Sequence, residues 1–122
     1  MPRAALVSRP DLPRAAAFPR SARLTRAADF DRVFAQGRRY RTRHFTFVYA
    51  PAPGSPRLGL AVGRRASPRA VVRNRIKRIA RESFRHSHLP AFDVVVIARP
   101  GLEGVSRETL RGEFDAAFRG LK

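Results

Sequence analysis

The stretch that most constrains the fold runs from Val71 to Arg85 and reads Val-Val-Arg-Asn-Arg-Ile-Lys-Arg-Ile-Ala-Arg-Glu-Ser-Phe-Arg. At about 100° per residue, its apolar and small side chains fall in one sector of a helix. These are Val72, Ile76, Ile79, Ala80 and Ser83. The opposite sector carries polar and basic side chains: Asn74, Lys77, Arg78, Arg81 and Arg85, with Arg73 and Arg75 at its borders. The pattern predicts a helix over 72–86 that buries one stripe and exposes a cationic face.

The segments on both sides of this helix are typical of strands. Residues 43–50 alternate, with Phe45, Phe47 and Tyr49 on one side. Residues 57–63 alternate between larger apolar and small side chains, and the small-residue face allows another backbone or a ligand to come close. After the helix, residues 93–98 form a short apolar run rich in β-branched residues, which predicts a buried strand.

Two more helices are expected, one near each end of the folded part. Thr25 is predicted to cap a short first helix that Gly37 ends, and Ser106 to cap the last helix. The apolar face of the first helix consists of Phe30, Val33 and Phe34. The apolar face of the last helix consists of Leu110, Phe114, Ala117, Phe118 and Leu121. The predicted order is αββαβα, with room for an extra strand over 37–41. The expected fold is a single α+β domain with helices packed on a small central sheet.

Positive charge is concentrated in the first two thirds of the chain. The net charge is +17, and residues 1–85 hold 21 of the 26 basic residues but only four of the nine acids. An arginine-rich proteome explains a preference for Arg over Lys, but it does not explain the missing acids. A compact state with this much like charge repels itself, so the natural partner is a polyanion.

The first 22 residues differ in composition from the rest. They contain four prolines and four arginines without helical or strand periodicity, which predicts a disordered basic tail. An Arg-rich transit peptide is the alternative, although the prolines disfavour the amphipathic helix that it needs. Residues 23–122 are predicted to form the folded domain.

The exposed face of the central helix contains like-charge pairs, which repel each other and which an ordinary solvated helix face avoids. Lys77–Arg81 and Arg81–Arg85 are like-charge pairs at i,i+4, and each costs about 0.2–0.5 kcal/mol. Glu82 is the single acid among nine basic residues between Arg64 and Arg85. An external anion that relieves the repulsion explains this pattern, and a plain solvated helix face remains the alternative.

The residue inventory argues against a catalytic site within the chain. There is no cysteine, which excludes disulfides, thiolate chemistry and Cys-based zinc sites. The acids are scattered, no glycine-rich phosphate loop is present, and His86-x-His88 has no evident third metal ligand. We therefore expect no catalytic residue, no metal site and no small-molecule substrate. No apolar run reaches the length of a membrane span, and no signal-peptide hydrophobic region is seen, so we expect a cytoplasmic protein without a membrane partner.

The central helix resembles a known family. The run Arg73-Asn74-Arg75-Ile76-Lys77-Arg78, continued by Arg81-Glu82-Ser83-Phe84-Arg85, is similar to the signature helix of the protein subunit of bacterial ribonuclease P. The resemblance extends outward, in order, to residues 57–65, to Asp29-Phe30, Val33-Phe34 and Gly37, and to Arg43-His44-Phe45. It covers residues 24–122.

The resemblance implies a fold, an activity and partners. The family's order is αβββαβα, with a left-handed βαβ crossover through the signature helix, as in one domain of a small-subunit ribosomal protein. Such crossovers are right-handed in about 98% of cases, so general rules predict the other hand. The implied catalyst is the RNA subunit, with Mg²⁺ held mainly by RNA, and it removes the 5′ leader of precursor tRNA by phosphodiester hydrolysis. The protein is implied to bind the RNA subunit and the leader, and to have no catalysis of its own.

The resemblance also implies two sets of site residues. The set facing the RNA subunit is Arg64, Arg65, Arg73, Asn74, Arg75, Lys77, Arg78 and Arg81. The set lining a leader cleft is Phe34 and Phe45 first, then Phe30, Tyr40 and Phe47, where stacking on a base is worth about 1–3 kcal/mol. Plain core packing is the alternative for each aromatic residue.

Three other functions remain open from the sequence. A general structured-RNA-binding or ribosome-associated protein fits the charge equally well, but it has no leader-dependent role. A DNA-binding module needs a partner helix at helix-turn-helix spacing, which is not evident. A membrane-surface binder needs an exposed apolar helix face, whereas the flanking strands place that face of the central helix in the core.

Overall fold

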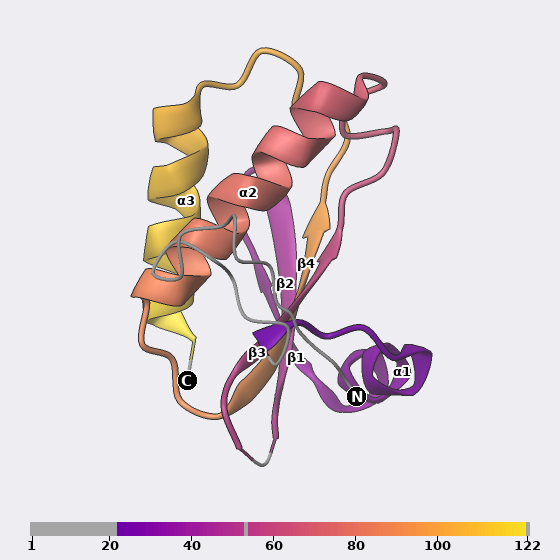
Figure 1. Cartoon of the computed structure of the whole chain (residues 1–122), viewed down its shortest axis with the longest axis vertical. Helices are drawn as coiled ribbons and strands as arrows, with labels where there is room; N and C mark the ends of the chain where they lie inside the picture. The colour runs from indigo at the N-terminus through magenta and orange to yellow at the C-terminus, as the bar shows by residue number, and fades with distance from the viewer. Residues whose placement is uncertain (1–21, 53, 122) are drawn as a thin grey trace, which may run out of the picture.

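The computed structural model describes residues 22–52 and 54–121 (Figure 1). Its elements are α1 (Ala27–Gln36), β1 (Arg38–Arg41), β2 (Phe45–Pro51), β3 (Arg57–Ala61), α2 (Ala70–His86), β4 (Phe92–Ala98) and α3 (Arg107–Gly120). The order αβββαβα agrees with the α+β prediction and includes the extra strand. The predicted tail lies outside the described residues except for Ala22.

The four strands form one mixed sheet in the order β1-β2-β4-β3. The pairs β1–β2 and β2–β4 are antiparallel, whereas β3 runs parallel to β4. Parallel neighbours need a crossover connection, and α2 supplies it. In Figure 1, α2 and α3 lie on one side of the strands and α1 on the other. Both faces of the sheet are therefore covered by helix.

The larger core lies between the sheet and the helices α2 and α3. The predicted apolar stripe of α2 is buried along its whole length, which confirms the helical pattern. Aromatic rings fill the space beside it, and the ring centres of Phe45 and Phe114 are 4.4 Å apart. Phe47 meets Phe118 edge-on at 5.5 Å. The first pair is tilted and the second edge-on, and close aromatic pairs add to the stabilisation from burial alone.

The smaller core lies under α1. Val33, Val48 and Val95 are fully buried there, and Phe30 packs against them. The small-residue face of β3 receives this helix, because a Cβ atom at Gly59 would lie only 2.7 Å from the ring of Phe30. The close approach predicted at this face is therefore made by a side chain of the same chain.

The ends of α1 differ in part from the prediction. Arg26, not Thr25, is the N-cap residue, and no side chain caps this end. Gly37 does end the helix, with its N–H donating to the carbonyl of Val33 at 2.7 Å. A Cβ at Gly37 would lie 2.4 Å from that carbonyl oxygen and 2.9 Å from a methyl of Val48, so glycine is required by space. The Ser106 cap of α3 is confirmed, since its hydroxyl accepts from the N–H of Thr109 at 3.1 Å.

A buried carboxylate joins α1 to the sheet. Asp93, at the start of β4, is fully buried. It accepts hydrogen bonds from Nε and Nη2 of Arg57 at 2.9 and 2.7 Å, and it also pairs with Arg32 of α1. The bonds to Asp93 raise the pKa of Arg57, and Asp29 of α1 adds a further ion pair at 3.4 Å. Charge pairing thus fixes the position of α1 where β3 and β4 begin.

Candidate nucleic-acid interface

The face of α2 opposite the core presents the predicted cationic residues. Asn74 and Arg78 are exposed, whereas Lys77, Arg81 and Arg85 are half-buried. Lysine and arginine stems commonly lie along apolar surface while the charged ends reach water. The predicted charged sector therefore lies on the outside of the helix, with Asn74 and Arg78 at its most accessible positions.

The basic loop before α2 is held in place by contacts with the loop before α3. Arg64 and Arg65 are both exposed. The hydroxyl of buried Ser67 donates to the carboxylate of Glu103, with oxygen distances of 2.9 and 2.7 Å. Arg69 donates to the same carboxylate at 3.1 Å, and hydrogen bonds from Arg69 and Ser67 lower the pKa of Glu103. The loop thus presents its two arginines from an ordered backbone.

Two arginines of the predicted set have a structural part as well. Arg73 donates from Nη1 to the carbonyl oxygens of Ser67 and Pro68, both at 3.0 Å. This side chain therefore ties the first turns of α2 to the basic loop. Arg75 is half-buried, and its Nε has no hydrogen-bond partner within the described chain. A buried donor without a partner is costly, so an acceptor brought by a bound molecule would stabilise this side chain.

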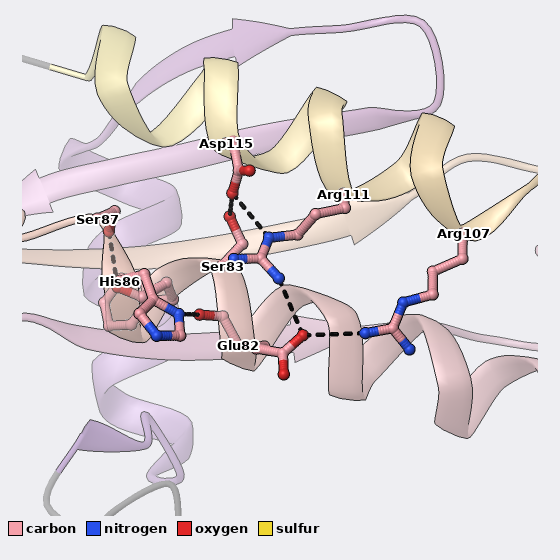
Figure 2. A network of polar contacts seen from close by, with 8 residues as sticks. Glu82, Ser83, His86, Ser87, Arg107, Arg111 and Asp115 are labelled. Carbon is pink, nitrogen blue, oxygen red and sulfur yellow. Dashed lines mark hydrogen bonds and ion pairs between the residues drawn. The ribbon is translucent and has the colours of Figure 1, made fainter. Parts of the chain in front are cut away.

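The one acid of α2 is directed toward α3 and neutralised there (Figure 2). Glu82 pairs with Arg107 at 3.2 Å and with Arg111 at 2.9 Å. On the same helix pair, Asp115 accepts from Arg111 at 3.0 Å and from the hydroxyl of Ser83. Burial alone would raise the pKa of Asp115, but these two hydrogen bonds outweigh it and lower the pKa. The cationic face of α2 therefore carries no free acid within residues 70–86.

Sequence reasoning missed this interhelical network. The signal was present as the spacing Arg107, Arg111 and Asp115, which places the three side chains on one face of α3 at i, i+4 and i+8. It missed a second basic surface too. Four arginines on β1 and the following turn are exposed, at the sheet edge opposite β3: Arg38, Arg39, Arg41 and Arg43.

The five predicted aromatic residues divide into three groups. Phe45 and Phe47 are fully buried in the larger core, so neither ring has the free face that stacking on a base requires. Their assignment to an exposed leader cleft does not agree with the structure, because α3 covers that face of β2 with Phe114 and Phe118. Core packing, the alternative, describes both rings.

The other three aromatic residues keep some exposed surface but are not brought together. Phe34 on α1 is 39% exposed and Tyr40 on β1 is 40% exposed. Tyr40 lies on the face that α3 covers, since a Cβ at Gly120 would be 3.8 Å from its hydroxyl. Phe34 belongs to the helix on the opposite face. Phe30 is half-buried on Gly59, so only part of its ring is accessible.

The described residues contain neither a cluster of metal-ligand side chains nor a membrane-spanning helix. No group of three or more His, Asp or Glu side chains is placed to hold a metal ion in residues 22–52 and 54–121. Over the same ranges, no helix combines the length and the apolar character that crossing a bilayer requires.

Comparison with known proteins shows the family. The family model for ribonuclease P matches residues 18–122. The ribonuclease P protein component of Legionella pneumophila (strain Lens) is 46% identical over 87 residues, covering 70% of this chain and 76% of that protein. The component from Thioalkalivibrio sulfidiphilus is 42% identical over 101 residues, covering 80% and 84%.

Solved structures agree with these sequence matches. The ribonuclease P protein of Thermotoga maritima superposes with a TM-score of 0.72 at 30% identity, covering 82% of this chain and 97% of that one. The Staphylococcus aureus protein gives 0.72 at 30% identity, covering 78% and 90%. The chain therefore belongs to the family of bacterial ribonuclease P protein components, the protein part of an endoribonuclease that processes the 5′ leader of tRNA.

Proposed function

We propose that the exposed face of α2 and the basic loop before it bind the catalytic RNA subunit. The observation that carries this proposal is the one-sided charge of α2. Its only acid, Glu82, is paired with two arginines of α3, whereas Asn74, Lys77 and Arg78 lie on the outward side. Lysine and arginine ends that reach phosphates release condensed counterions, which favours binding at moderate salt. The proposed contact set is Arg64, Arg65, Arg73, Asn74, Arg75, Lys77, Arg78 and Arg81.

The 5′ leader of precursor tRNA is the second proposed ligand. Among the aromatic residues that the structure describes, Phe34 and Tyr40 have the most exposed surface, and each offers a ring to a base. Because they lie on opposite faces of the sheet, we propose that a leader uses Phe34, with the accessible part of Phe30 beside it on α1. Stacking tolerates different bases, which suits leaders of differing sequence.

The proposed role requires chemistry that the protein does not supply. We propose that Mg²⁺ is held mainly by the RNA subunit and the substrate, and that the protein positions RNA for the reaction. The proposed place of action is the cytoplasm, as expected for a bacterial protein that takes part in tRNA processing.

A cleavage assay at low Mg²⁺ tests the proposal. A bacterial ribonuclease P RNA acts on precursor tRNA with and without the full-length protein, and the protein alone serves as a control. We expect stimulation that requires the RNA and weakens when the leader is cut to one nucleotide. Arg78→Ala is the sharpest variant, because Arg78 is exposed and its side chain makes no hydrogen bond or ion pair within the described residues.

Matched variants separate the proposed sites from general charge. Arg39→Ala removes the same charge from β1, at the far edge of the sheet, and should retain stimulation. Phe34→Ala should weaken leader-dependent binding by about 1–3 kcal/mol and leave the affinity for the RNA subunit unchanged. Tight RNA binding without any stimulation would contradict the proposal and leave a general RNA-binding protein, the alternative function.

A further inference from the structure

Glu103 lies beside the proposed RNA-binding surface, where its negative charge would repel a phosphate. It belongs to the loop between β4 and α3, and its side chain is 41% exposed. Removing such an acid should strengthen the attraction between a protein of charge +17 and a polyanion. An isolated surface ion pair contributes little to stability, so stability alone does not explain an acid at this position. Its contacts point to a different role.

A tight turn fixes the position of Glu103. The N–H of Val105 donates to the carbonyl of Leu102 at 3.3 Å, so Glu103 and Gly104 are the two central residues of the turn. Gly104 has a φ of 83°, a left-handed conformation that glycine adopts without strain at the third position of such a turn. Leu102 is fully buried in the larger core. The core therefore anchors the turn that carries Glu103.

This anchored turn lies directly against the basic loop before α2. The N–H of Gly101 donates to the carbonyl of Arg65 at 3.1 Å, and the N–H of Leu102 donates to the carbonyl of Ala66 at 2.8 Å. Ala66 is itself buried in the larger core. The two loops are thus joined through their backbones at the residues that follow Arg64.

The side chain of Glu103 holds the part of the basic loop that leads into α2. Its two carboxylate oxygens accept from the hydroxyl of buried Ser67, and one of them also accepts from Nε of Arg69. The hydroxyl of Ser67 in turn accepts from the N–H of Arg69 at 3.2 Å. Arg69 is the N-cap residue of α2, and its own side chain does not cap the helix. Glu103 therefore fixes the junction between the basic loop and α2.

The positive charges around Glu103 keep its carboxylate ionised. Hydrogen bonds from Arg69 and Ser67, and then the charges of Arg69 and Arg75, lower the pKa of Glu103. Because Arg75 belongs to the proposed contact set, the field of Glu103 reaches the RNA-binding face of α2. The pairing with Arg69 partly neutralises Glu103, which reduces the repulsion that a nearby phosphate would meet.

We propose that Glu103 is a positioning residue for RNA binding, which holds the basic loop so that Arg64 and Arg65 meet the RNA subunit together with α2. The inference rests on the proposed function, and it adds an acid that touches no RNA itself. A loop that is ordered before binding avoids the loss of loop and side-chain freedom that association otherwise costs. This gain outweighs the repulsion between one paired carboxylate and the RNA.

The sign of the effect on affinity distinguishes positioning from charge. Glu103→Ala makes the protein more positive by one unit, so charge alone would tighten RNA binding. Glu108→Ala makes the same change at an exposed acid in the first turn of α3 and serves as the control. Ser67→Ala removes the buried hydroxyl without any change of charge. Binding of each full-length variant to a bacterial ribonuclease P RNA is measured across a series of salt concentrations, well below the melting temperature of every variant.

Glu103→Ala should weaken RNA binding roughly three- to tenfold, which is the cost of ordering one or two side chains on association. The slope of log K against log salt should decrease in magnitude by about one or two, because the contacts of Arg64 and Arg65 are partly lost. Ser67→Ala should weaken binding in the same direction. Glu108→Ala should bind as tightly as the parent or more tightly.

A double-mutant cycle tests whether Glu103 acts through the loop. Arg65→Ala should weaken binding less in the Glu103→Ala background than in the parent, because the loop no longer presents Arg65 to the RNA. Arg78→Ala, on the exposed face of α2, should weaken binding equally in both backgrounds. A general disturbance of the fold would reduce both effects, so the comparison separates positioning from misfolding.

Two results would overturn the positioning role. One is RNA binding by Glu103→Ala that is as tight as binding by Glu108→Ala, and the other is a loss that simply adds to the loss from Arg65→Ala. The proposed function would stand in either case if Arg78→Ala still abolished stimulation in the cleavage assay. Absence of stimulation by the unmodified protein would overturn the proposed function instead.

Discussion

Replacing Asp93 with Asn removes the buried negative charge on which Arg57 and Arg32 converge. The carboxylate is fully buried and accepts two hydrogen bonds from Arg57, at 2.9 and 2.7 Å, in addition to its contact with Arg32. Removing one partner from a buried ion pair costs about 3–5 kcal/mol. The side chains of Arg57 and Arg32 are 31% and 30% exposed, so both regain some hydration when the carboxylate is lost.

We therefore expect Asp93→Asn to lower the free energy of unfolding by about 3 kcal/mol, at the low end of that range. For a domain of this size, the loss corresponds to a fall in melting temperature of roughly 10–15 °C. Urea unfolding followed by circular dichroism measures the first quantity, and a thermal scan measures the second. The asparagine amide keeps the shape of the side chain, so the change reports charge pairing and not a cavity.

The control is Asp31→Asn, which makes the same change of net charge at an exposed position of α1. Loss of one acid from a chain of charge +17 increases self-repulsion in both variants. Asp31→Asn should stay within about 0.5 kcal/mol of the parent. If the two variants lost equal stability, general repulsion would explain the effect and the argument from the buried cluster would be refuted.

Two further predictions concern the contacts of α3. Glu82→Gln should lower the free energy of unfolding by about 1 kcal/mol, because two half-exposed ion pairs with Arg107 and Arg111 are lost. Glu108→Gln, which changes an exposed acid of α3, is the control, and equal losses in urea unfolding would contradict the role of the network. Acid should destabilise the fold below about pH 5. Hydrogen bonds from Thr42 and His44 outweigh burial and lower the pKa of Glu113, so its contribution is present above its unfolded pKa and is lost as the pH falls through the folded value. Glu113→Gln should reduce the difference in stability between pH 6 and pH 3, and an unchanged difference would count against this assignment.

The secondary structure could be predicted from local patterns. The apolar stripe of α2, the alternation of β2 and β3 and the cap at Ser106 depend on residues within a few positions of one another, and the structure agrees with each. The charged face of α2 followed from the same periodicity. Periodicity shows which side chains share a face, and charge shows which of those faces resists burial.

Local patterns could not predict whether each aromatic side chain is buried or exposed. Phe45 and Phe34 are both apolar residues at regular spacing, yet one is fully buried and the other is 39% exposed. The difference comes from α3, which brings Phe114 onto the ring of Phe45 from about 70 positions away in the chain. The spacing of residues within one segment cannot predict a contact between segments so far apart in the chain.

By itself, the sequence determined the elements, their order and the cationic helix, because these depend on short-range periodicity and on composition. Only the tertiary structure decided which charges are engaged. It paired Glu82 with α3, buried Asp93 between two arginines, and joined Glu103 to the basic loop before α2. Each of these arrangements joins segments distant in the chain. Their energies depend on distance and burial, which exist only once the sheet has brought the helices together.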